Sequence, residues 1–126
     1  MKALSIKQPY AELILLGKKK IELRRWNTNF RGEFIIHASK IPDKEAMEKF
    51  GFFNLALGCI VGKVNLVDVK KYKNELEHNK DKELHLASSA FGNYGFVLKD
   101  VKGLKPIPCK GNLGFWKFDE KKLMED

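Results

Sequence analysis

The chain has 126 residues, of which 44% are hydrophobic, so it is long enough to bury a core, and we expect residues 1–126 to form a single domain. Lys and Arg number 24 against 16 Asp and Glu, and the resulting net charge of +8 favours a polyanionic partner. The two cysteines are too few for a disulfide framework, and no apolar run would make a signal peptide or a membrane span, so we expect a cytoplasmic protein without membrane contact.

The first predicted elements are a strand and a helix. Residues 3–6 alternate weakly and indicate a short strand, after which Pro9 is placed as the first residue of a helix. Apolar side chains then recur at helical spacing, at Tyr10, Leu13 and Ile14. Gly17 is well placed to end this helix in a left-handed conformation, so the helix leads directly into a basic stretch.

Residues 17–26 are the stretch in which we expect the function. They hold five cations, one carboxylate and an indole behind a glycine. Residues 20–25 indicate a strand, whose alternation places three charged side chains on a face towards a cleft or solvent, namely Lys20, Glu22 and Arg24. The other face then carries Ile21, Leu23 and Arg25. Lys19 can join the charged face only if it still lies in the turn after Gly17.

The charge of this region has two interpretations. Residues 1–31 carry eight Lys and Arg against two Glu, which is +6 of the total +8, and such asymmetry indicates a polyanionic partner. For any single one of these lysines a solvated edge strand is the better interpretation. The total charge alone would fit a lysine-rich surface equally well. The group is less easily explained in that way, because an edge strand does not need Glu22, Arg24 and Trp26 as well.

The middle of the chain predicts a strand, a helix and a long strand. Residues 33–38 indicate a buried strand that ends at His37, for which a satisfied core position is more common than catalysis. Asp43 is the expected N-cap of a helix that runs to about residue 50. Residues 58–72 give the strongest strand pattern, and its phase flips after Leu66, which predicts a bulge.

The last third predicts a polar segment and two further strands. Residues 73–83 are charged and indicate a surface loop or an exposed helix, and His78 and His85 lack the companions of a metal site, so we expect neither a metal nor another cofactor. Residues 94–98 and 114–118 indicate strands. Between them, residues 106–109 read as an edge segment. The expected fold is mostly β with inserted helices (α+β): a small barrel of five to six strands with two to three helices.

Several of these motifs together resemble the ASCH domain family, the activating-signal-cointegrator homology domain. The matching residues run over nearly the whole chain: 5–11, Gly17-x-Lys19-x-x-Glu22-x-Arg24 with Trp26, Arg31-Gly32, His37-Ala38-Ser39, 58–69, and Gly111-x-x-Gly114-x-Trp116. The resemblance implies a PUA-like β-barrel that binds RNA or single-stranded nucleic acid in a basic cleft beside the first helix. Carried over, the candidate nucleic-acid-binding residues are Ser5, Lys7, Gln8, Lys19, Glu22, Arg24, Arg25 and Trp26.

These residue types suit the chemistry of a nucleotide. Lysine and arginine hold phosphates, and Glu22 can accept a hydrogen bond from an exocyclic amine of a base. Trp26 can stack on a base, although a place in the core at the end of the barrel fits it equally well, and for Trp116 the core is favoured. The first hypothesis is therefore a module that binds RNA or a single nucleotide.

The alternative is a small hydrolase, an N4-acetylcytidine amidohydrolase-like enzyme or a ribonuclease. Some bacterial members of the resembled family deacylate N4-acetylcytidine with a lysine, a threonine three positions later and a distant glutamate. Here Lys19 matches the lysine, but Glu22 stands in place of the threonine, a departure that counts against this activity. Glu75 and Glu77 are the candidates for the distant acid. A lysine beside a glutamate and an arginine acts as a base in some sites and forms an ordinary ion-pair network in more.

Two further alternatives stay open. Thr28 and Ser39 offer hydroxyl groups, but no histidine partner is visible for either of them. A basic face also binds acidic protein surfaces, so a protein-interaction module is a third hypothesis.

Overall fold

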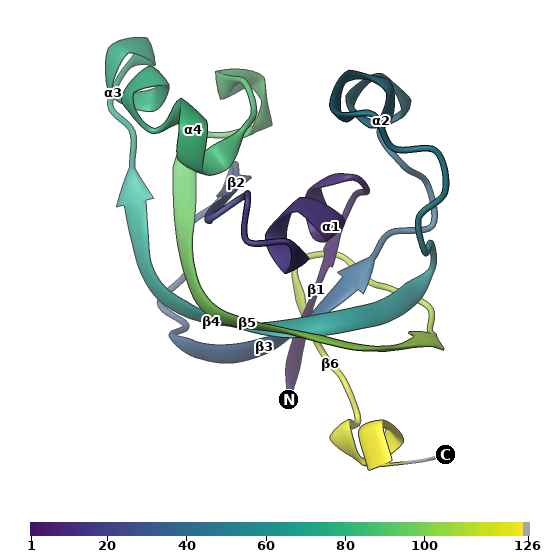
Figure 1. Cartoon of the computed structure of the whole chain (residues 1–126). Coiled ribbons are helices and arrows are strands. Elements are labelled where there is room, and N and C mark those ends of the chain that lie inside the picture. The colour runs from purple at the N-terminus through teal and green to yellow at the C-terminus, as the bar shows by residue number, and fades with distance from the viewer. Residues whose placement is uncertain (125–126) are drawn as a thin grey trace.

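A mixed sheet of six strands frames the part of the protein that the computed structural model describes, residues 1–124 (Figure 1). The strands are β1 (Lys2–Ile6), β2 (Ile21–Arg24), β3 (Gly32–Ala38), β4 (Cys59–Lys71), β5 (Tyr94–Pro108) and β6 (Phe115–Lys117). Their order across the sheet is β2-β5-β4-β3-β1-β6. The pair β1–β3 is parallel and the other pairs are antiparallel.

The sheet coils into a half-barrel because its two long strands are bulged. The pairing of β4 with β5 shifts between Leu66 and Asp68, where Leu66 faces Leu98 but Asp68 already faces Val97. This shift confirms the bulge predicted from the phase flip after Leu66, and bulges raise the local twist and bend of a strand. β2 and β6 lie at the two edges of the sheet order. The expected mostly β, α+β fold is therefore confirmed, in the form of an open half-barrel.

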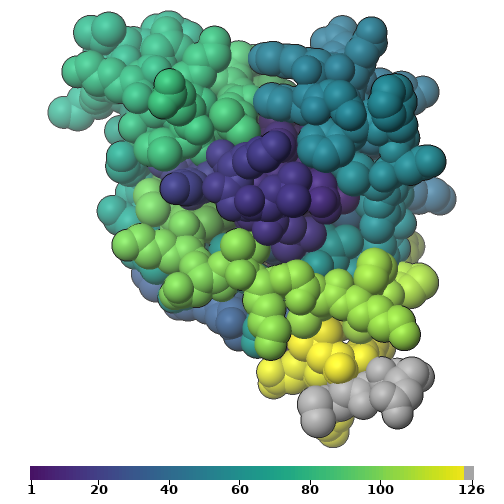
Figure 2. Space-filling view, viewed as in Figure 1, coloured from purple at the N-terminus to yellow at the C-terminus, as the bar shows by residue number. Residues whose placement is uncertain are grey.

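Short helices cover the concave face of the sheet. They are α1 (Tyr10–Leu15), α2 (Lys44–Phe50), α3 (Glu75–Lys80) and α4 (Lys82–His85), with the 3-10 turn η1 (Ser89–Phe91). A second 3-10 turn, η2 (Glu120–Met124), follows β6 on the side away from α1 (Figure 1). Figure 1 shows α1 seated in the middle of the curved sheet. In Figure 2 the atoms of this N-terminal segment lie between the segment of α3 and α4 on one flank and that of α2 on the other. No helix of residues 1–124 is both long and apolar enough to cross a membrane.

Alternation along the strands divides the apolar side chains into two clusters. In β3, Phe34 and Ile36 join the large core against α1, whereas Ile35 points to a smaller cluster on the opposite face. The buried Leu13 and Ile14 of α1 complete the large core. Because α1 fills the concave face, its ends and the loops around it are held at the open mouth of the half-barrel.

The helix signals read from the sequence hold locally. The Asp43 side chain accepts a hydrogen bond from the Ala46 N–H at 3.1 Å, as expected of an N-cap, and α2 ends at Gly51 with φ +77°. α1 begins at Tyr10, so Pro9, expected as the first residue of the helix, is instead its N-cap. Gly17 has φ +76°, so the left-handed conformation expected there is present, one residue beyond the C-cap.

The segment from residue 73 onwards differs from its prediction. It forms α3 and α4, whose surfaces are largely exposed, but His78 and His85 are both buried. Their rings lie 4.2 Å apart, and the Tyr72 ring is 5.0 Å from that of His78. The segment therefore has a core of its own, which a count of charged residues along the chain does not reveal. The predicted strand 94–98 and residues 106–108 of the predicted edge segment 106–109 are the two ends of one strand, β5.

Candidate functional site

The turn between α1 and β2 places Lys19 beside the charged face of β2. The N–H groups of Lys18 and Lys19 both donate to the Leu13 carbonyl, at 2.9 and 3.0 Å, so the chain is still turning at Lys19 and becomes extended only at Ile21. Ile21 is buried in the core. The side chain of Glu22 therefore points away from that core, towards Lys19.

Lys19 is a buried cation. Its side chain is 2% exposed, and its ammonium donates a hydrogen bond to the His85 carbonyl at the end of α4. The same nitrogen lies 3.6 Å from Glu22 Oε1 and 5.0 Å from the centre of the Tyr10 ring. Burial lowers the pKa of the Lys19 ammonium below its ordinary value, and the Glu22 carboxylate opposes this shift without cancelling it.

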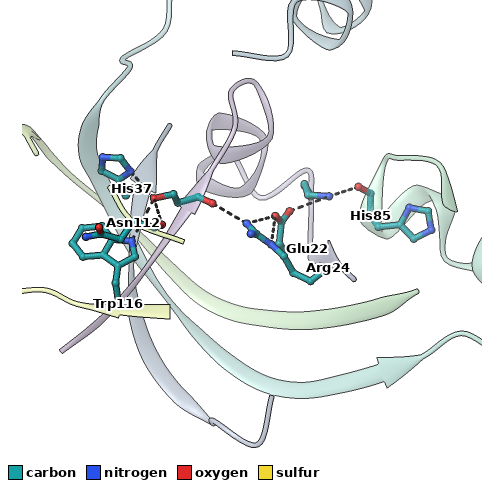
Figure 3. Close-up of polar contacts among 8 residues, drawn as sticks. Glu22, Arg24, His37, His85, Asn112 and Trp116 are labelled. Atoms are coloured by element: carbon teal, nitrogen blue, oxygen red, sulfur yellow. Dashed lines mark hydrogen bonds and ion pairs between the residues drawn. The ribbon is translucent and has the colours of Figure 1, made fainter. Parts of the chain in front are cut away.

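Glu22 links Lys19 to Arg24 (Figure 3). Arg24 donates to Glu22 Oε2 from Nη2 at 2.8 Å and from Nε at 3.1 Å, and its Nη2 also donates to the Ser5 carbonyl at 2.9 Å. The carboxylate thus holds a cation at each oxygen, and the arginine ties β2 to β1. The side chains of Glu22 and Arg24 are 10% and 20% exposed, so the arginine retains some access to solvent.

A second polar group fixes the segment between β5 and β6. His37 Nε2 lies 2.7 Å from the Cys109 carbonyl, and its Nδ1 lies 2.9 Å from Ser5 Oγ. Because a carbonyl only accepts, Nε2 carries the proton, and in the neutral ring Nδ1 accepts from the Ser5 hydroxyl. A Cβ on Gly111 would meet Ser5 Oγ at 2.5 Å and His37 at 2.6 Å. His37 is therefore a satisfied core residue, as the sequence predicted.

The first polar group, together with Ser5 of the second, lines a cavity of about 620 Å³. Seven of the eight candidate binding residues line it: Ser5, Lys7, Lys19, Glu22, Arg24, Arg25 and Trp26. Gln8 does not, because it is buried, donates to the Ala56 carbonyl at 3.1 Å and accepts from the Glu12 N–H at 2.9 Å. Lys20, which the strand alternation placed on the charged face, is exposed and lines a different cavity.

Aromatic and apolar side chains complete the wall of this cavity. Trp26 is half-buried, packs edge-on against Phe96 at 5.3 Å, and still lines the cavity, so both interpretations of it are partly correct. Phe91 of η1 also lines the cavity, is 40% exposed, and lies 5.4 Å from the Tyr10 ring. Leu113 stands at the rim with 98% of its surface exposed.

Sequence reasoning missed several lining residues because no local pattern marks them. Tyr10 appears in the sequence only as an apolar position of a helix, and Phe91 lies in a segment without periodicity. The missed group also includes Asp43, which the sequence marked only as a helix cap, and Ala87, Ala90, Asn112 and Leu113. Trp116 lies outside the cavity wall, with its ring 5.6 Å from that of His37, which agrees with the core role favoured for it.

The hydroxyl and carboxyl groups considered for catalysis are distributed differently. Ser39 lines the cavity, whereas Thr28 does not and accepts a hydrogen bond from the Phe30 N–H at 3.1 Å. Glu75 and Glu77 belong to α3 and do not line the cavity. The described part of the chain holds no group of three or more His, Cys, Asp or Glu side chains suited to a metal ion.

Comparisons with known proteins agree on one family. A family model described as the ASCH domain matches residues 4–108. Activating signal cointegrator 1 of Homo sapiens is 29% identical over 133 residues, and that of Mus musculus 30% identical, each match covering 94% of this chain and 22% of the relative. The chain therefore spans about a fifth of the length of these relatives.

Solved structures share the fold. The crystal structure of ASCH from Zymomonas mobilis superposes with a TM-score of 0.68 at 15% identity, covering 98% of this chain and 90% of that one. A mutant of the same protein superposes with a TM-score of 0.60 at 19% identity, covering 85% of this chain and 72% of that one. At these identities the likeness concerns the architecture alone.

Proposed function

The chain belongs to the ASCH domain family, and from that premise we propose that it is a single domain that binds RNA or single-stranded nucleic acid, holding one nucleotide in the cavity around Glu22 and Arg24. One observation carries the proposal: cationic side chains and aromatic rings line the same cavity. Four cations, Lys7, Lys19, Arg24 and Arg25, face two acids, Glu22 and Asp43. A positive cavity with rings in its wall suits a phosphate joined to a planar base.

The cationic residues that line the cavity differ in exposure and therefore in their expected role. Lys7 and Arg25 are exposed, and although Arg25 Nη2 donates to the Ala90 carbonyl at 2.9 Å, both side chains reach solvent and can meet phosphates. Lys19, in contrast, is buried and engaged with His85 and Glu22. Lys19 therefore acts on the ligand indirectly, by fixing the carboxylate and through its charge. This role differs from the direct contact that the family resemblance suggested for it.

The base is expected to lie between the aromatic residues and the carboxylate. Trp26 and Phe91 offer ring surface within the cavity, and each base stacked on an aromatic ring contributes about 1–3 kcal/mol. Among residues 1–124 the polar contact of Glu22 Oε1 is the 3.6 Å approach to Lys19, so this oxygen can still accept a hydrogen bond from an exocyclic amine.

The test is a titration with short single-stranded RNAs at about 50 and 200 mM salt, where phosphate contacts make affinity fall steeply. The double variant Lys7→Gln/Arg25→Gln is expected to lower the slope of log K against log salt by about 1.4, at about 0.7 per lost contact. Lys105→Gln/Lys117→Gln removes the same charge from exposed positions outside the cavity. Salt-insensitive binding, or an equal effect of the control pair, would contradict the proposal.

A hydrolase acting on N4-acetylcytidine or RNA is the second candidate. The observation that favours it is the buried Lys19 ammonium, whose lowered pKa and 3.6 Å contact to Glu22 suit a proton-transfer pair. Time-dependent product that disappears in Glu22→Gln would support this candidate, and product that survives the change would exclude these residues.

An acidic protein partner is the third candidate, and failure of RNA to compete for the same surface would favour it.

A further inference from the structure

A second cavity, of about 470 Å³, shares Lys19 with the first. It is bordered by the end of α1, the start of β2, Leu84 of α4 and the bent part of β5. Most of its wall is aliphatic, with Ile14, Ile21, Val64, Val97, Leu98 and Val101. Because Lys19 lines both cavities, the α1–β2 turn lies between the first cavity and the second.

A bulge in β5 shapes this cavity. Lys63 and Asn65 of β4 pair with Lys102 and Lys99 of β5, so β5 carries one extra residue in this interval. Asp100 takes up the extra length with φ +55°, a left-handed conformation that few residues besides glycine adopt. The pairing is interrupted at this point, and the half-buried Val101 lines the cavity. Bulges of this kind often lie beside functional sites.

The rim of the second cavity is positive. Lys20, Lys70 and Lys99 are exposed and face one acid of the lining, Asp100. Lys70 is paired with Asp81 at 2.9 Å, but within residues 1–124 neither Lys20 nor Lys99 has a carboxylate within 4.0 Å. Lysines that gather without partners around an apolar cavity are stabilised by an anion.

The backbone holds Lys20 firmly at this rim. Its N–H donates to the Leu84 carbonyl at 2.8 Å, and its carbonyl accepts from the Leu98 N–H at 3.0 Å. The position at which its side chain leaves the backbone is thus fixed from both α4 and β5. The same turn places Lys19 in the wall of the first cavity, so one backbone turn contributes residues to both cavities.

We propose that the second cavity holds the continuation of the nucleic-acid strand whose nucleotide occupies the first, with phosphates at Lys20 and Lys99 and a base on the aliphatic wall. This inference rests on the proposed function and extends it: the ligand is a strand of several nucleotides, not a free nucleoside. Among the described residues that line the second cavity, Asp100 has the one side chain that can accept a hydrogen bond from an exocyclic amine, so the affinity there is expected to come chiefly from the phosphates and the aliphatic wall.

The experiment measures the affinity of oligouridylates of one, two, four and eight nucleotides at about 100 mM salt. For the wild type, affinity is expected to rise with length by about 25-fold, the value for two phosphate contacts on a single strand at this salt concentration. Lys20→Gln/Lys99→Gln is expected to abolish that gain and to leave mononucleotide binding unchanged. Lys105→Gln/Lys117→Gln, with the same charge change elsewhere, is expected to keep the gain.

A second variant tests the cavity without changing charge. Val101→Phe fills the space from its wall, and it too is expected to remove the length gain while the mononucleotide still binds. If the wild type binds the mononucleotide but gains nothing with length, or if the control pair loses the gain equally, the second cavity is not a strand site and the proposed function stands. If no oligonucleotide of any length binds, the proposed function fails and this inference fails with it.

Discussion

Replacing Glu22 by glutamine tests whether the buried carboxylate holds the site together. Glu22 contacts Lys19 at 3.6 Å and Arg24 at 2.8 and 3.1 Å, and the Lys19 side chain is 2% exposed. Removing one member of such a buried ionic group costs about 3–5 kcal/mol, because the remaining cations lose their counter-charge. For a chain of 126 residues, unfolding entropy of about 2.1 cal/mol/K per residue makes each kcal/mol worth about 4 °C, so we expect Tm to fall by about 12–20 °C.

The loss should depend on pH with a defined sign. Burial lowers the pKa of Lys19, so below its ordinary value of 10.5 the native state binds fewer protons than the unfolded state, and stability from this group rises with pH. Without Glu22 the pKa of Lys19 falls further, so the rise of stability with pH extends over a wider interval and is larger in total. The difference in stability between wild type and variant is therefore expected to narrow from about pH 7 to about pH 10. It does not vanish, because Arg24 stays charged.

Thermal unfolding followed by far-UV circular dichroism measures both effects. Glu33→Gln is the matched control, since Glu33 is 44% exposed, pairs with Lys63 at 3.5 Å, and should contribute only about 0–1 kcal/mol. Lys19→Met/Glu22→Gln should be more stable than Glu22→Gln alone, because no buried ammonium is left beside the lost carboxylate. A decrease in Tm of less than about 4 °C would refute the reasoning. A loss of stability of equal size at about pH 7 and about pH 10 would refute it as well.

Three further results are expected. Gly111→Ala should destabilise the protein by about 1–3 kcal/mol in thermal unfolding, because the new Cβ would meet Ser5 Oγ at 2.5 Å, whereas Gly103→Ala meets nothing within 4 Å and should be near neutral. Burial raises the pKa of Tyr10 to about 12, so between pH 10 and pH 12 the native state keeps a proton that the unfolded chain releases, and the stability of the fold should decrease over this interval. Tyr10→Phe should remove this decrease and should also remove one step of the phenolate absorbance titration. Phe91→Ala should weaken RNA binding by about 1–3 kcal/mol, and Phe53→Ala, which removes an exposed ring that does not line the cavity, should not.

Several features of the fold and site follow from local sequence patterns. The alternation of residues 21–24 correctly predicted that Ile21 lies in the core and that Glu22 faces the opposite, charged side. Lys19 lies in the turn after Gly17, which is the condition stated for its side chain to reach Glu22. Capping by Asp43 and the bulge after Leu66 were also predictable. Side-chain direction in a strand and the first turn of a helix depend on neighbours within a few residues, and such neighbours are written in the sequence itself.

The remaining features depend on contacts between distant segments. The sequence analysis predicted that Gln8 binds the ligand and that residues 73–83 form a surface segment. In the structure Gln8 is buried and donates to the Ala56 carbonyl, and the His85 carbonyl accepts from Lys19, which lies 66 positions earlier in the chain. The second cavity exists because a bulge in β5 lies opposite the turn after α1, which no local pattern records. The sequence alone thus determined the elements, the face of each strand and the family to which the chain belongs. Only the tertiary structure decided which of the charged side chains are buried anchors and which stay open to a ligand, because burial is set by whatever packs across the half-barrel.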